Sequence, residues 1–204
     1  RNYGVVYGPM ISEEIRAGRP AFAQLGVRER ALFDRVTALF AQTSLQLDYT
    51  EDVIGISWSV ILKNVYAILF GAADELGLGD NVRGFLTVAA LRELDAIVTG
   101  FGGKAAAPYH LAGLGDLITT ATSAGSHHYA LGGILVRGEL DRISGEGVHT
   151  LATVRKYALL DIEMYPMFAL VESLVSDPED IQEKIGAYLE GWFQPRVMPF
   201  PERT

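Results

Sequence analysis

The feature that most constrains this chain is a long apolar run that contains a single charged residue. Between Asp52 and Asp74 the only charged side chain is that of Lys63. A helix that is apolar all round is typical of a protein interior, where a lysine is costly unless something offsets its charge. Burial lowers the pKa of a lysine, and an amine that loses its proton near neutrality can serve as an acid/base catalyst. The alternative is a lysine at a helix end whose amine reaches water.

The same run is long enough to raise the question of a membrane span. Residues 53–73 could cross a bilayer by length alone. A Lys63-Asn64 pair at the middle of that span would cost roughly 2.5–3.5 kcal/mol for the lysine, and Ser57 and Ser59 lower the apolar character further. The run is therefore interpreted as a buried core helix in a soluble protein, without a membrane span.

Composition excludes several other classes of function. The chain has 204 residues, a formal net charge of −8 and no cysteine. The acidic balance argues against a nucleic-acid partner, and the lack of cysteine rules out disulfides, thiol nucleophiles and thiolate metal sites. His127 and His128 are adjacent, so on a helix their side chains would point about 100° apart and would not converge on a metal. No metal site is predicted. No signal peptide is visible, and a cytoplasmic location is predicted.

Strand and helix signals divide the chain near residue 50. Residues 1–50 resemble the end of an α/β domain, with a turn at Gly8-Pro9 and the order strand, helix, strand that is typical of a parallel sheet. Strands are predicted over 3–7, 21–27 and 45–49, and helices from Ser12 and over 28–42.

From residue 51 onward only helices and loops are predicted. The central helix covers 52–76, and Asp80 or Asn81 caps the next helix, which runs to Gly100. Further helices are predicted around 110–111 and 116–120, up to Val136 with Ser123 or Ser126 as cap, over 148–160, over 165–175 with Pro166 in the first turn, and after 177–180, followed by an irregular proline-rich tail at 194–204. The predicted fold class is mainly α.

Two motifs carry a resemblance to a known family. The first is Leu62-Lys63-Asn64-Val65 followed by Gly71-Ala72-Ala73-Asp74-Glu75-Leu76-Gly77-Leu78-Gly79-Asp80-Asn81, and the second is Leu111-Ala112-Gly113-Leu114-Gly115-Asp116-Leu117-Ile118-Thr119-Thr120. Together they resemble the C-terminal domain of NAD(P)-dependent glycerol-3-phosphate dehydrogenases. The resemblance implies a multi-helix substrate domain over 51–204, similar to the C-terminal-like fold of 6-phosphogluconate dehydrogenase. It also implies a truncated Rossmann remnant over 1–50.

The resemblance also implies roles for individual residues. Lys63 is the expected catalytic acid/base, with the Asp116 carboxylate beside it in one cleft. The residues implied for substrate are Gly8, Asn64, Thr120, Ser126, His127 and His128, and those implied for the cofactor are Pro9, Ser12, His127, Ser144 and Glu146. Taken alone, Asp116 could instead cap its own helix, and the Thr120 hydroxyl could bond back to the preceding turn.

The chain departs from the family at the segment Ser126-His127-His128. There the family carries Ser-Arg-Asn, whose arginine grips the substrate phosphate. A histidine does not reproduce the bidentate geometry of a guanidinium group and is only partly charged near pH 7. This departure suits either a changed substrate or a lost activity.

The predicted function is the interconversion of sn-glycerol 3-phosphate and dihydroxyacetone phosphate with NAD or NADP, by a homodimer. The chain shows no Gly-x-Gly-x-x-Gly turn after a strand, so these residues alone are not expected to bind the cofactor, and activity of the chain on its own is doubtful. Two alternatives are a non-catalytic helical association domain and a dehydrogenase for another small hydroxy compound.

Overall fold

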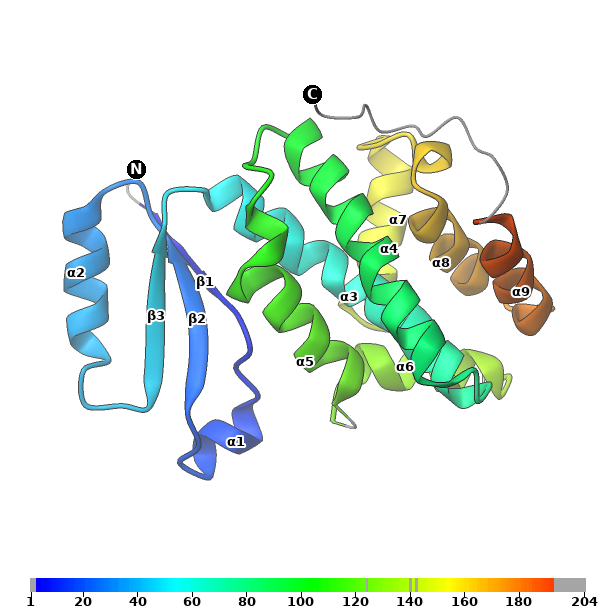
Figure 1. The fold of residues 1–204 in the computed structure, drawn as a ribbon, viewed down its shortest axis with the longest axis horizontal. Coiled ribbons are helices and arrows are strands. Elements are labelled where there is room, and N and C mark those ends of the chain that lie inside the picture. The colour runs from blue at the N-terminus through cyan, green and yellow to red at the C-terminus, as the bar shows by residue number, and fades with distance from the viewer. Residues whose placement is uncertain (1–2, 124, 140, 142, 193–204) are drawn as a thin grey trace. The chain divides into compact units, whose positions relative to one another are not determined.

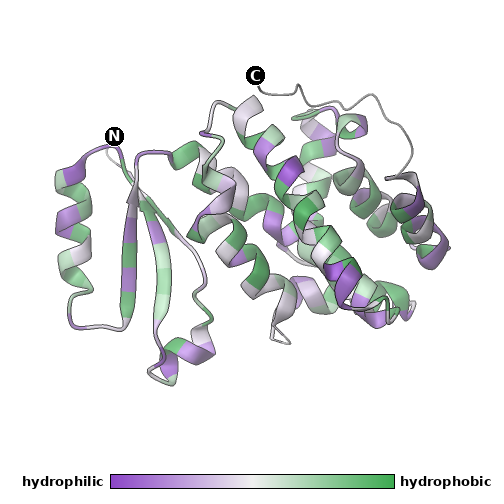
Figure 2. Ribbon diagram, in the orientation of Figure 1, coloured by the Kyte–Doolittle hydropathy of each residue, from purple (hydrophilic) through white to green (hydrophobic). Residues whose placement is uncertain are grey.

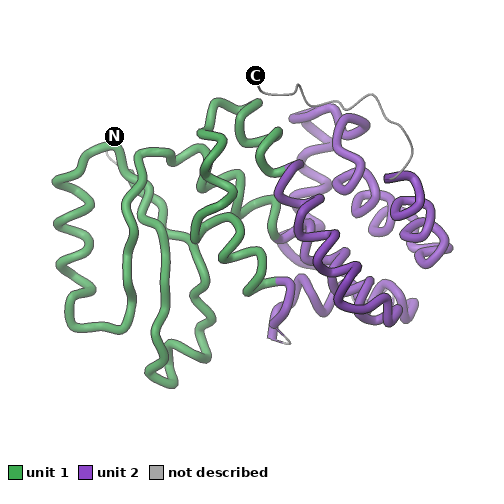
Figure 3. Tube along the Cα trace, viewed as in Figure 1, with its two compact units in different colours: residues 1–63, 94–120 green, residues 64–93, 121–204 purple. Residues whose placement is uncertain are grey.

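The protein is described by a computed structural model that covers residues 3–123, 125–139, 141 and 143–192. The chain forms two compact units (Figures 1 and 3), one made of residues 1–63 and 94–120 and the other of residues 64–93 and 121–204. Helices α3 (Val53–Glu75) and α4 (Gly79–Gly100) contribute residues to both. The proline-rich tail predicted at 194–204 lies outside the described residues.

The first unit contains a three-stranded sheet in the order β1-β2-β3. Its elements are β1 (Val5–Tyr7), α1 (Ser12–Arg16), β2 (Ala21–Gly26), α2 (Arg30–Leu39) and β3 (Leu45–Thr50). Strands β2 and β3 are parallel, as the order strand, helix, strand predicts. Strand β1 is antiparallel to β2, which was not predicted, because the segment between them turns the chain back on itself. The sheet is therefore mixed.

Apolar clusters lie on both faces of this sheet. On one face Leu25, Val27 and Phe33 form a buried cluster, against which Val6, Leu32, Val36, Leu47 and Tyr49 pack. On the other, Val5 packs against a cluster of Ile56, Val60 and Ala112. Val5 and Val6 point to opposite faces because successive strand side chains alternate. Figure 2 shows apolar and polar residues alternating along β3.

Short helical turns lead from α4 to the segment that carries Asp116. They are the 3-10 turn η1 (Ala107–Tyr109), the π-helical turn η2 (Leu111–Gly115) and α5 (Asp116–Thr122). The side-chain oxygen of buried Gln24 accepts a hydrogen bond from the Ala112 amide at 3.2 Å, which ties η2 to β2. Short helices were predicted here, but the π-helical geometry was not. Such turns are common near functional sites.

Helix α3 follows the predicted central helix closely. By length and composition it could cross a membrane, but 67% of its most apolar window is buried inside the protein. Such burial is that of a core helix, as predicted, and a single helix of this kind does not indicate a membrane span.

The second unit is helical throughout its described residues. Its remaining elements are α6 (His127–Val136), α7 (Glu146–Tyr157), η4 (Ile162–Met164), α8 (Pro166–Ser176) and α9 (Ile181–Gly191). Ser126 caps α6 by accepting a hydrogen bond from the Tyr129 amide at 3.3 Å, and Pro166 occupies the first turn of α8 as predicted. Helix α4 begins at Gly79, so the predicted caps Asp80 and Asn81 lie inside the helix instead of preceding it.

Two glycines let α3 and α6 approach closely. A Cβ atom at Gly71 would overlap the Tyr129 carbonyl oxygen, and one at Gly132 would overlap the backbone of Ile68 and Ala72. The helices therefore meet through main-chain atoms. Around them lies a core whose largest fully buried side chains include Tyr66, Ile68, Leu69, Phe70, Leu86, Leu131 and Phe168.

A buried carboxylate joins three helices of this unit. Glu93 of α4 is 2% exposed. Its oxygens accept hydrogen bonds from the Tyr66 hydroxyl at 3.1 Å and from the amides of Met167 and Phe168 at 2.5 and 3.0 Å. The two amides lie in the first turn of α8, where a helix has no internal acceptors for them. Burial raises the pKa of Glu93 to about 7 despite these hydrogen bonds.

Candidate active site

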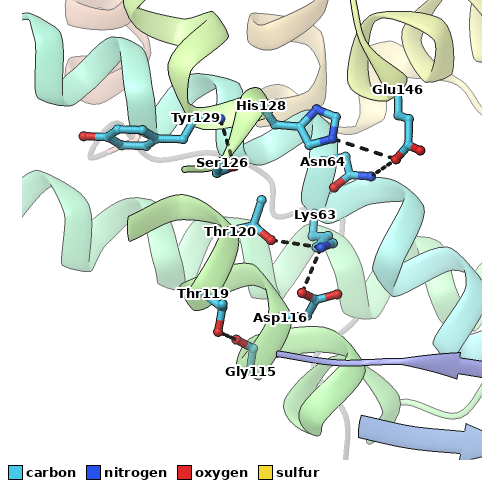
Figure 4. A network of polar contacts seen from close by, with 10 residues as sticks. All are labelled: Lys63, Asn64, Gly115, Asp116, Thr119, Thr120, Ser126, His128, Tyr129 and Glu146. Carbon is cyan, nitrogen blue, oxygen red and sulfur yellow. Dashed lines mark hydrogen bonds and ion pairs between the residues drawn. The ribbon is translucent and has the colours of Figure 1, made fainter. Parts of the chain in front are cut away.

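The predicted lysine and aspartate are in direct contact. Lys63 of α3 lies with its Nζ atom 2.8 Å from Asp116 Oδ1, although 53 positions separate the two residues. The amine also donates to the Thr120 hydroxyl at 2.9 Å (Figure 4). The side chains of Lys63 and Asp116 are 13% and 8% exposed. Lys63 thus pairs inside the first unit, and the alternative of a lysine that extends to water is wrong.

Burial and the nearby positive charge shift the pKa of Asp116 in opposite directions. Removal from water raises the pKa of this carboxyl, while the nearby Lys63 ammonium, its hydrogen bond and a hydrogen bond from Thr120 lower it; the net direction is upward. Thr120 lies one helical turn after Asp116 in α5, so one short helix presents both groups to the amine. The arrangement holds the lysine amine in place beside a carboxylate and a hydroxyl.

Glycines place the start of α5 beside the predicted Gly8-Pro9 turn. A Cβ atom at Gly115 would lie 3.7 Å from Pro9 Cδ, so the turn adjoins the residue that precedes Asp116. Gly8 is buried, and a Cβ atom there would lie 2.6 Å from the Phe22 carbonyl oxygen, so this position accepts only glycine without a shift of β2. Ser12 is exposed at the first residue of α1.

A second polar group lies in the second unit. Asn64 follows Lys63 in α3, is 7% exposed, and donates from Nδ2 to Glu146 Oε2 at 3.0 Å. The Glu146 side chain is 82% exposed at the first residue of α7, and its Oε2 atom also lies 3.8 Å from His128 Nε2 (Figure 4). Each of these residues was predicted separately. The contact between Asn64 and Glu146 was not, because 82 positions separate them and neither motif contains both.

The paired histidines behave differently from each other. His127 Nε2 lies 2.9 Å from the Ser144 carbonyl oxygen. A carbonyl only accepts, so Nε2 carries the proton in this contact. His128 instead approaches the Glu146 carboxylate. The ring centroids are 5.9 Å apart with planes at 69°, and the described residues contain no group of three potential metal-ligating side chains.

Comparison with known proteins identifies the family. A family model described as the NAD-dependent glycerol-3-phosphate dehydrogenase C-terminus matches residues 52–186. The chain belongs to that family. It is 34% identical over 202 residues to a glycerol-3-phosphate dehydrogenase [NAD(P)+] from Thermosynechococcus vestitus, covering 96% of this chain and 65% of that protein. It is 38% identical over 149 residues to one from Deinococcus radiodurans, covering 73% of this chain and 45% of that protein.

A solved structure agrees with these matches. The crystal structure of glycerol-3-phosphate dehydrogenase from Coxiella burnetii superposes with a TM-score of 0.82 at 26% identity, covering 93% of this chain and 60% of that one. The mainly helical fold predicted for the family is therefore confirmed. The chain spans about half to two thirds of the length of the dehydrogenases it matches.

Proposed function

We propose that this chain supplies the proton-transfer residues of an NAD(P)-dependent dehydrogenase that interconverts sn-glycerol 3-phosphate and dihydroxyacetone phosphate. The observation that carries the proposal is the 2.8 Å contact between the Lys63 amine and the buried Asp116 carboxylate. Membership of the dehydrogenase family supports it, and so does the similarity to relatives that are glycerol-3-phosphate dehydrogenases.

Lys63 and Asp116 have distinct roles in the proposed step. For oxidation of the alcohol, Lys63 in its amine form accepts the proton of the carbon-2 hydroxyl as the carbon–oxygen double bond forms. The ammonium that results lies against the Asp116 carboxylate, which stabilises the new charge where it develops. The bound nicotinamide supplies the acceptor for the hydride that leaves carbon 2. In the reverse direction Lys63 returns its proton to the carbonyl oxygen, and Thr120 keeps the amine in position.

The residues assigned to the cofactor fit a nicotinamide nucleotide in their chemistry. Glu146 is an exposed carboxylate that can accept hydrogen bonds from ribose hydroxyls or a carboxamide. Ser12 and Ser144 are exposed and offer hydroxyl groups, and Pro9 adjoins the start of α5. We propose that these residues, with His127, hold NAD or NADP, while Gly8, Asn64, Thr120, Ser126, His127 and His128 contact the substrate.

One contact favours a second candidate function, a dehydrogenase for a different small hydroxy compound. His127 stands where the family carries its phosphate-gripping arginine, and its Nε2 atom is already bonded to the Ser144 carbonyl. A neutral imidazole held in this way has one remaining nitrogen, which accepts and does not donate to phosphate. Comparing kcat/KM for glycerol 3-phosphate and for small alcohols without a phosphate separates the two candidates.

We further propose that the protein is a cytoplasmic homodimer. Ile54 and Ile61 are seven residues apart on one side of α3 and are 45% and 38% exposed, which supports self-association. Sedimentation showing a monomer at micromolar concentration would contradict the dimer.

Activity of a Lys63 variant tests the proposed reaction. In the complete reading frame that encodes this chain, Lys63→Met should lower kcat for glycerol 3-phosphate oxidation by about 10²–10⁴-fold, measured as NADH or NADPH formed. Lys63→Ala should regain part of the rate on addition of a small primary amine, because the amine replaces the missing proton acceptor.

The matched control is Lys156→Met. It removes an exposed lysine from the last turn of α7 and should leave kcat unchanged. A wild-type enzyme that turns over no glycerol 3-phosphate with either cofactor would overturn the proposal. A Lys63→Met variant with wild-type kcat would do the same.

A further inference from the structure

The segment Gly145-Glu146-Gly147 is a tightly built corner between three helices of the second unit. Gly147 lies against α3, where a Cβ atom would be 2.7 Å from the Asn64 carbonyl oxygen. Gly145 has φ +131°, and a Cβ atom there would be 2.9 Å from the His127 ring in α6. Neither position accepts a side chain without displacing a neighbour. The backbone of this segment therefore packs directly on the Asn64 main chain and on the His127 ring.

At this corner the exposed Glu146 carboxylate contacts the buried side-chain amide of Asn64. Glu146, between the two glycines, accepts from Asn64 Nδ2 at 3.0 Å. An ionised carboxylate can only accept hydrogen bonds, so the Asn64 side chain must turn its NH₂ group toward Glu146. Its Oδ1 atom is then the acceptor presented to any other group. The orientation of the Asn64 amide follows from the acceptor oxygen that Glu146 places against it.

We propose that Glu146 is a positioning residue, which orients Asn64 so that the Asn64 Oδ1 atom accepts a hydrogen bond from a substrate hydroxyl. The inference rests on the proposed dehydrogenase function and extends it, because it assigns Glu146 a task separate from any contact with the cofactor. With its orientation reversed, the amide would present its NH₂ group to the substrate hydroxyl. The hydroxyl hydrogen would then have to point away from Asn64, and its hydrogen bond to Asn64 would be lost. The preference is for an alcohol substrate that donates at this position.

A double-mutant cycle on kcat tests the coupling. At saturating NAD(P), Glu146→Ala should lower kcat for glycerol 3-phosphate by about tenfold. In an Asn64→Ala background the same change should have no further effect, because the residue it orients is absent. Glu146→Gln should lower kcat by less than Glu146→Ala does, because the glutamine side-chain oxygen can still accept from Asn64 Nδ2. Glu172→Ala is the matched control, since Glu172 pairs with Arg155 of α7 and not with Asn64; it should leave kcat unchanged.

The Asn64 side-chain amide gives a readout that does not depend on activity. In protein labelled with ¹⁵N at asparagine, one Asn64 amide proton should be shifted downfield and exchange slowly with water. Both signatures should be lost in Glu146→Ala and kept in Glu146→Gln. If the wild-type enzyme does not oxidise glycerol 3-phosphate, the proposed function fails, and this spectrum still decides the positioning role. Unchanged Asn64 signals in Glu146→Ala would overturn it, and so would a loss confined to KM for NAD(P) that is equal in both backgrounds.

Discussion

Two buried carboxylates, one in each unit, are held in opposite ways. Asp116 in the first unit faces the Lys63 ammonium and the Thr120 hydroxyl. Glu93 in the second unit accepts its hydrogen bonds from neutral groups, a tyrosine hydroxyl and two backbone amides. Burial raises the pKa of both carboxyls, that of Glu93 to about 7. The comparison distinguishes two uses of a buried carboxylate. Asp116 belongs to a charge pair suited to proton transfer, whereas Glu93 links helices through hydrogen bonds.

The largest effect is expected where the charge pair is broken. Lys63→Met leaves the Asp116 carboxylate buried without its cation, and removal of one partner of a buried pair costs about 3–5 kcal/mol of unfolding free energy. Adding Asp116→Asn removes the uncompensated charge, so the double variant should recover most of the loss. Urea unfolding at pH 8 measures both. Equal losses in the single and double variants would show that packing of the lysine stem, and not charge, sets the cost.

Glu93 should make stability depend on pH. Its pKa is raised in the folded protein, so the folded state binds more protons than the unfolded state between pH about 4.5 and 7. The contribution is fully present below about pH 4.5 and is lost as the pH rises through 7. At about 1.4 kcal/mol per pH unit, the whole change is about 3 kcal/mol.

Urea unfolding between pH 5 and 8 tests this dependence. The raised pKa of Asp116 gives a slope of the same sign, so the informative quantity is the difference between wild type and Glu93→Gln, which cannot titrate. The Glu93→Gln protein should show the flatter profile. Parallel profiles would mean that Glu93 does not change its charge in this range.

The positions of these carboxylates show what the sequence could predict. The unbroken apolar run around Lys63 predicts a buried helix, and the two motifs predict that Asp116 approaches the lysine; both expectations are confirmed by the structure. The helices themselves follow from periodicity, from the cap at Ser126 and from Pro166 in the first turn of α8. These signals are local or are contained in a motif.

Other features depend on packing between distant segments. Glu93 follows Leu86 and Ala90 and precedes Ile97 at helical spacing, so it lies in the buried stripe of α4; that signal was available, but the partners in α8 were not. The antiparallel pairing of β1 and the Asn64–Glu146 contact likewise join residues that no local pattern relates. The sequence therefore predicts which polar residues are buried more readily than it predicts which distant residues are in contact.

The smallest effect is expected from removing a single neutral donor. Tyr66→Phe deletes one of three hydrogen bonds to Glu93 and should cost about 1–2 kcal/mol at pH 8. Because that hydrogen bond lowers the pKa of Glu93, the midpoint of the pH profile should also move upward. Thr120→Val is the matched change at Asp116 and should cost less, since Lys63 remains. A Thr120→Val loss larger than that of Tyr66→Phe would reverse the comparison.

The glycine crossing between α3 and α6 has a consequence for how this family member can diversify. Gly71 and Gly132 seat the two helices on each other by main-chain atoms, so the location of the α6 start is insensitive to the side chains that it carries. Positions 127 and 128 can therefore exchange one polar group for another while the contact between α3 and α6 stays the same. A change at the histidine pair would thus alter the chemistry of this surface and leave the packing of the two helices intact.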